Sequence, residues 1–230
     1  MRPGSIMPVD CPDFDSALNA WSTFYKRSLY ATSMGKQENA KRPLGKSREA
    51  WYQVLARYYE DPPAKYAEDS RWQSDLAAIT GHLHLGEWLT YSGDLEAAHE
   101  ALEPVRRIWM QIRERNGVRW FGDQLTRYHD VMEPVVLWGT GKAHGGVTEE
   151  NAEAFEAEVA ALAEAWRKVE QFGPPRATGM RRRRFAIFMS QESEAIADLQ
   201  QVIAERRLEE VPEAARAVKN VFRSLYMGFG

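Results

Sequence analysis

Two segments of the chain carry the same pattern of potential ligands. A histidine, an acid, two apolar residues, a glutamate, a proline and a valine follow one another at residues 99–105 and again at residues 129–135. Residues i and i+4 lie on the same side of a helix, so the histidine and the glutamate of each segment can reach one point. The proline after each glutamate removes a backbone hydrogen bond and bends the helix. We interpret the repeated pattern as two helices bent around a site.

The repeated pattern predicts a transition-metal site. His99, Glu103, His129 and Glu133 would supply two nitrogen and two oxygen ligands. Consecutive helices of an up-down bundle are neighbours, which brings both pairs together. Imidazole and carboxylate ligands favour Fe, Zn, Mn or Cu over Ca or Mg. We expect the site to lie between the third, fourth and fifth predicted helices and to serve binding, sensing or storage.

A third helix adds two further candidates, His84 and Glu87. On a helical wheel Glu87 falls within the apolar stripe of Leu76, Ile79 and Leu83. A buried carboxylate is costly unless it is paired or bound to a metal. His84 and Glu87 are therefore expected as additional ligands or as side chains that hold the ligands in place.

Metal-free interpretations stay open beside the metal site. A histidine and a glutamate four residues apart often form an ordinary surface pair worth only ~0.3–0.5 kcal/mol. His99, His129 and Glu87 could also form a buried polar network with Arg106. The alternative function is a helical scaffold that binds a partner protein through a basic face, which consists of Arg181, Arg182, Arg183 and Arg184.

The elements that must position these residues are helices nearly throughout. Long segments rich in Ala, Glu, Arg, Leu and Gln are separated by short Pro and Gly stretches. Eight helices are expected, at about 15–34, 47–60, 70–91, 94–116, 121–136, a segment around 164–166, 180–206 and from 208 onward. Aromatic residues at helical spacing are expected in the core, namely Trp21, Trp51, Tyr58, Trp72, Trp88, Trp109 and Trp166.

The helical pattern begins again in the second half of the chain. The apolar spacing that follows Phe121 matches the spacing that follows Phe14, and Glu-Ala-Trp before Pro-Pro occurs in both halves. We predict an all-α fold made by tandem duplication of a four-helix up-down unit, with units at 1–118 and 119–230. The alternative is eight unrelated amphipathic helices in accidental register.

Composition excludes several classes of protein. The 230 residues are 44% apolar and 27% charged, as in globular proteins. The single cysteine, Cys11, excludes an intrachain disulfide framework and a Cys-rich metal site. A net charge of −3 disfavours a nucleic-acid binder, and no apolar run is long enough for a membrane span.

The residues near Met1 lack the apolar core of a signal peptide, which fits the cytoplasm, or the periplasm if a leader was replaced. No nucleophile elbow, HExxH or phosphate-loop motif occurs, so binding is expected rather than catalysis.

Overall fold

The computed structural model describes residues 13–173 and 179–230, and this part of the chain contains eight α-helices, two short 3-10 helices and no strand. Cys11 lies outside the described residues. The chain divides into two compact units, Met1–Gly117 and Val118–Gly230, hereafter unit 1 and unit 2. The fold is therefore all-α, as the sequence predicts.

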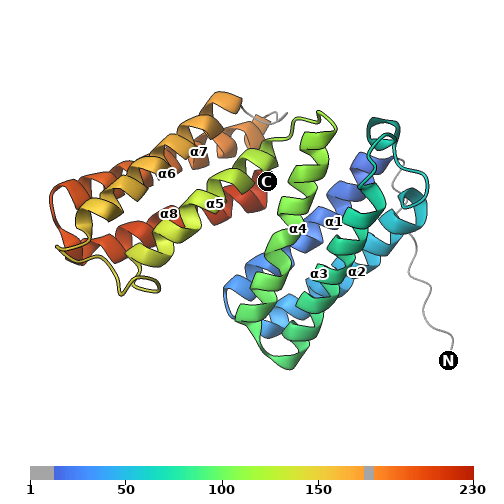
Figure 1. Ribbon diagram of the computed structural model, residues 1–230, viewed down its shortest axis with the longest axis horizontal. Coiled ribbons are helices and arrows are strands. Elements are labelled where there is room, and N and C mark those ends of the chain that lie inside the picture. The colour runs from blue at the N-terminus through green and yellow to red at the C-terminus, as the bar shows by residue number, and fades with distance from the viewer. Residues whose placement is uncertain (1–12, 174–178) are drawn as a thin grey trace. The chain divides into compact units, whose positions relative to one another are not determined.

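Unit 1 is a ring of four helices in which consecutive helices pack side by side and α1 also packs against α4 (Figure 1). Its elements are α1 (Phe14–Ser33), α2 (Gln37–Tyr58), the 3-10 helix η1 (Ala64–Tyr66), α3 (Trp72–Ser92) and α4 (Leu95–Arg115). Gly93, with φ of 94°, ends α3, and the Asp94 carboxylate caps α4 by accepting from the Ala97 amide at 3.0 Å. The predicted break between these helices is confirmed.

Helix α2 begins ten residues earlier than the sequence predicts. The expectation placed its start at Ser47, whereas the helix starts at Gln37 and carries Pro43 inside it. A proline inside a helix costs one backbone hydrogen bond. The helix continues across Pro43 because Ala40, Leu44 and Ser47, spaced three to four residues apart, are all buried on one face.

Aromatic rings fill the centre of unit 1. Trp109 of α4 lies 6.1–6.2 Å, between ring centroids, from one or more rings of each other helix. These rings belong to Phe14, Trp21, Trp51 and Trp72, all buried. The expectation for Trp88 was wrong, because this side chain is 66% exposed on α3. Helical spacing alone did not show that Trp88 lies on the solvent side of α3.

Unit 2 repeats the ring arrangement with its own helices. Consecutive helices pack together and α5 also packs against α8 (Figure 1). The elements are α5 (Phe121–Gly139), α6 (Ala152–Phe172), α7 (Gly179–Ala204), the 3-10 helix η2 (Leu208–Glu210) and α8 (Val211–Phe229). Tyr128 of α5 packs against Trp166 of α6 and Phe222 of α8. Each unit thus buries its own core.

Candidate functional site

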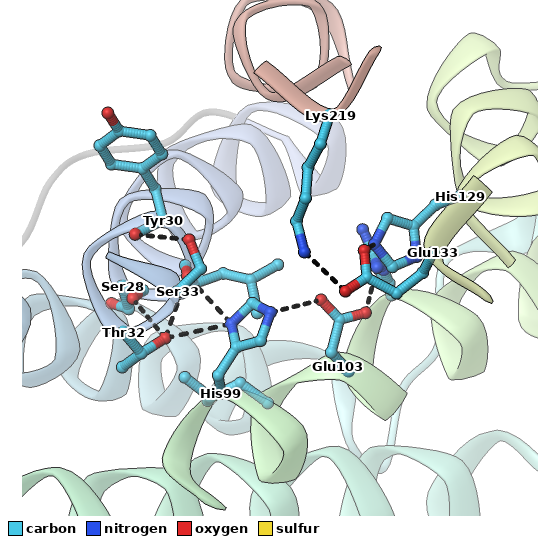
Figure 2. Close-up of polar contacts among 12 residues, drawn as sticks. Ser28, Tyr30, Thr32, Ser33, His99, Glu103, His129, Glu133 and Lys219 are labelled. Atoms are coloured by element: carbon cyan, nitrogen blue, oxygen red, sulfur yellow. Dashed lines mark hydrogen bonds and ion pairs between the residues drawn. The ribbon is translucent and has the colours of Figure 1, made fainter. Parts of the chain in front are cut away.

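The first predicted ligand pair lies on α4 and is tied to α1. Nδ1 of His99 lies 3.2 Å from the backbone oxygen of Leu29 and 3.3 Å from Oγ1 of Thr32. On its other side, Nε2 of His99 faces Oε1 of Glu103 at 3.3 Å (Figure 2). The second oxygen of Glu103 contacts the buried guanidinium of Arg106. Helical spacing brings the pair together, and contacts on both sides fix its orientation.

The second predicted pair lies on α5, in unit 2. Nε2 of His129 lies 3.5 Å from Oε2 of Glu133, and the imidazole is only 8% exposed. The ring packs on Phe222 of α8 at 5.2 Å between centroids. Nζ of Lys219, also on α8, donates to Oε1 of Glu133 at 2.6 Å (Figure 2). Each pair therefore combines an imidazole, a carboxylate and a cationic partner for one carboxylate oxygen.

The prolines that follow the two glutamates lie inside continuous helices. Pro104 is within α4 and Pro134 is within α5. The valine after each proline is buried, with 0% exposure for Val105 and 1% for Val135. These valines anchor both helices to their cores directly beside the His–Glu pairs.

His84 and Glu87 make their polar contacts with α2. Both oxygens of Glu87 accept from Nη1 of Arg48, at 2.9 and 2.8 Å. Nε2 of His84 lies 2.7 Å from the hydroxyl of Tyr52. Within unit 1 these two residues thus engage the neighbouring helix on the α2 side, whereas His99 engages α1. In the described chain, the carboxylate of Glu87 is therefore paired with the cation of Arg48 and not with a second metal-ligating side chain.

The described residues contain no cluster of three or more metal-ligating side chains. Across residues 13–173 and 179–230, no three His, Cys, Asp or Glu residues gather in a group that would hold a metal ion. Each His–Glu pair is accordingly a two-ligand arrangement.

The basic face on α7 is exposed. Its four residues, Arg181 to Arg184, are all exposed, and no acidic side chain in the described chain lies within 4.0 Å of them. Arg181 donates to the backbone oxygen of Gly228 at 3.3 Å and lies over the ring of Phe229. Arg184 lies over the ring of Phe188. Within the described ranges, Arg181 and Arg184 are thus held by aromatic rings and a carbonyl rather than by ion pairs.

A buried carboxyl on α7 was missed by the sequence analysis. Glu192 is 0% exposed, and its Oε1 accepts from the hydroxyl of Tyr128 at 2.6 Å. Its Oε2 has no hydrogen-bond partner among the described residues. Burial raises the pKa of Glu192 to about 8 and raises the pKa of Tyr128 well above its ordinary value. The helical spacing of Glu192 from buried Phe185 and Ile196 was the available signal.

Comparisons with known proteins give no relative. The chain matches no protein-family model, and no curated protein or solved structure is significantly similar to it. None of the helices in the described ranges combines the length and hydrophobicity that crossing a membrane requires.

Proposed function

We propose that the chain binds a transition-metal ion through its His–Glu pairs and acts in binding or sensing. The observation that supports this is the spacing of the ligand atoms, 3.3 Å between His99 Nε2 and Glu103 Oε1 and 3.5 Å between His129 Nε2 and Glu133 Oε2. Two ligand atoms at ~2.0–2.2 Å from one tetrahedral zinc ion lie roughly 3.3–3.6 Å apart. A direct charge-assisted hydrogen bond would be shorter, at about 2.7–2.9 Å.

The contacts of His99 support a ligand role for its Nε2. A backbone carbonyl only accepts, so the Leu29 oxygen requires the proton on Nδ1. Metal-bound histidines are commonly oriented in this way by a carbonyl on the second nitrogen. Nε2 then directs a lone pair toward the Glu103 oxygen. A cation between these two atoms, either a proton or a metal ion, would bind both of them.

The carboxylate of Glu133 supports a ligand role in the second pair. Its Oε2, the oxygen facing His129, is buried and has no hydrogen-bond partner in the described chain. Leaving a buried carboxylate oxygen unpaired is costly. A metal ion between this oxygen and the imidazole would remove that cost, with water completing the coordination because the pair supplies only two protein ligands.

Equilibrium dialysis of the untagged full-length chain against Zn²⁺ and Co²⁺, followed by elemental analysis, tests the proposal. We expect stoichiometric metal in the native chain, about half as much after either His99→Ala or His129→Ala, and none in the double variant. Bound Co²⁺ should also develop the visible absorption of low-symmetry coordination. His144→Ala, which removes a histidine from an interhelical loop, is the matched control.

Two results would overturn the metal proposal. One is a native chain that retains no metal after dialysis. The other is a double variant that retains as much metal as the native chain or the His144→Ala control, since the ion would then be held elsewhere.

A second candidate function, binding of an acidic partner protein, is favoured by the cations of the basic face, which have no ion-pair partner among residues 13–173 and 179–230. Exposed arginines without acidic neighbours attract a negatively charged surface. We expect Arg181→Glu/Arg183→Glu to weaken binding of poly-glutamate, used as the acidic probe, at least tenfold in low salt by fluorescence anisotropy. Arg167→Glu/Lys168→Glu on α6 changes the net charge equally and is the control. Equal weakening by both double variants would contradict a specific basic face.

We also infer that the two units arose by tandem duplication, which a repeated hydrogen bond supports. Nε1 of Trp51 on α2 donates to Oγ1 of Thr80 on α3 at 2.8 Å. Nε1 of Trp166 on α6 donates to Oγ of Ser193 on α7, also at 2.8 Å. In both units the hydroxyl then donates to the backbone oxygen four residues earlier. A matched donor, acceptor and relay on corresponding helices is the pattern that a duplicated unit would retain, and it supports duplication over accidental register.

A further inference from the structure

A pocket of about 470 Å³ opens between α1 and α2 in unit 1, on residues that no part of the proposed function uses. This volume lies within the ~300–1,000 Å³ range of small-molecule sites. Four of its lining side chains are cations, Arg27 on α1 and Lys36, Arg42 and Lys46 on or beside α2, and none is acidic. The pocket is thus defined by positive charge from two helices.

Among the residues that the structure describes, the four cations have no ion-pair partner. In the described chain no carboxylate lies within 4.0 Å of Arg27, Lys36, Arg42 or Lys46. The nearby Glu38 is held by Lys41 at 2.6 Å and does not line the pocket. Like charges gathered in one concave site repel each other. An anion of matching charge would remove this repulsion.

The start of α2 adds to the positive potential. Lys36 is the N-cap residue, and its side chain accepts no hydrogen bond from the first turn. The first amides of a helix carry partial positive charge and favour a bound anion when no side chain caps them. Asn39, in the first turn, lines the pocket. The helix end and the four cations therefore act on the same space.

Two aromatic side chains, Phe24 and Tyr30, form another part of the wall. Phe24 lines the pocket, and the ammonium of Lys46 lies 5.3 Å from the centroid of its ring. Tyr30, six residues further along α1, also lines the pocket. Pro43 adds an apolar ring from α2 and, lacking an amide proton, leaves the Asn39 carbonyl without its usual helical donor. Apolar rings suit the organic part of a ligand, and arginine with lysine suits phosphate.

We propose that this pocket binds an organic di- or triphosphate, with the phosphates on the four cations and the organic ring against Phe24 and Tyr30. The site is independent of the His–Glu pairs. We expect a small molecule as the ligand because the positive charge lies in a concave pocket flanked by aromatic rings.

Calorimetric titration of the full chain in EDTA tests the proposal, since EDTA prevents a metal ion on the His–Glu pairs from bridging to phosphate. ATP, pyrophosphate and adenosine are the probes. We expect ATP to bind more tightly than pyrophosphate, adenosine to show no binding, and Arg27→Ala/Arg42→Ala to weaken ATP binding at least tenfold. The matched control, Arg167→Ala/Lys168→Ala, removes two exposed cations from α6 of unit 2 and should leave ATP binding unchanged.

The melting temperature of the variant distinguishes loss of the binding site from loss of the fold. Removing mutually repelling cations should leave the melting temperature of Arg27→Ala/Arg42→Ala unchanged or higher, so lost ATP binding reports the site. Three outcomes would overturn the proposal: no ATP binding at millimolar concentration in low salt, equal affinity for ATP and pyrophosphate, or equal loss in the control variant.

Discussion

Replacing Glu192 with glutamine is expected to stabilise unit 2 progressively as the pH rises. The carboxyl is fully buried, and its pKa is raised to about 8 from an ordinary 4.5. Between these two values the folded chain keeps a proton that the unfolded chain has lost. The free energy of unfolding of the native chain therefore falls by about 1.4 kcal/mol per pH unit in this window, roughly 5 kcal/mol in all.

The neutral amide escapes this loss because it does not titrate. Its side-chain oxygen can still accept the hydrogen bond from the Tyr128 hydroxyl, which keeps its proton because burial raises the pKa of Tyr128. Below pH 4.5 the two proteins should differ little, since the carboxyl is protonated in both states. Above pH 8 the advantage of Glu192→Gln should be constant at its maximum.

Hydrogen exchange of the α5 and α7 amides at pH 5 and pH 9, corrected for the intrinsic exchange rate, measures this effect in unit 2. The informative quantity is the difference between variant and native chain, because other titrating groups cancel. Glu194→Gln changes an exposed carboxylate two residues away and should show no such trend. A variant-minus-native difference that is the same at both pH values would mean that Glu192 ionises normally.

Truncating Trp109 to alanine should destabilise unit 1 by about 3–5 kcal/mol, the usual cost of removing a large aromatic side chain from a core. Its ring is 2% exposed and touches aromatic rings of all three other helices of the unit. The loss is a large share of the ~5–15 kcal/mol stability of a typical domain. Because each unit has its own core, unit 2 should be unaffected.

Denaturant unfolding followed by near-ultraviolet circular dichroism, with hydrogen exchange to separate the units, measures this loss. Trp88→Ala removes the same side chain from an exposed position on α3 and should change stability by less than ~0.5 kcal/mol. Equal destabilisation by both variants, or loss of protection in unit 2 after Trp109→Ala, would contradict a core confined to unit 1.

Local features of the fold were predictable from the sequence, because they depend on residues close together in the chain. Gly93 and Asp94 mark a helix boundary through their own backbone and side-chain chemistry. The approach of His99 to Glu103 follows from helical geometry alone. The start of α2 was missed because burial of Leu44 outweighs the cost of Pro43, and burial depends on the packing of other helices.

Features that depend on packing between helices could not be predicted. Lys219 reaches Glu133 from 86 positions away in the sequence. The cations of the α1–α2 pocket are scattered over twenty residues of sequence, and they gather around one pocket only when the two helices pack. The burial of Glu192 is an exception, because its helical spacing from Phe185 and Ile196 is a signal that the sequence contains.

The closed ring of unit 2 has a consequence for its connectivity. The start of α5 and the end of α8 meet, since a side-chain carbon built on Gly122 would lie 2.8 Å from the carbonyl carbon of Gly230. With the chain cut between residues 120 and 121, a short peptide linker could join residue 230 to residue 121, while new termini of unit 2 open in the loop at 140–151. Such a circular permutant keeps every helix contact of the bundle, so the order of helices along the chain can be varied separately from their packing.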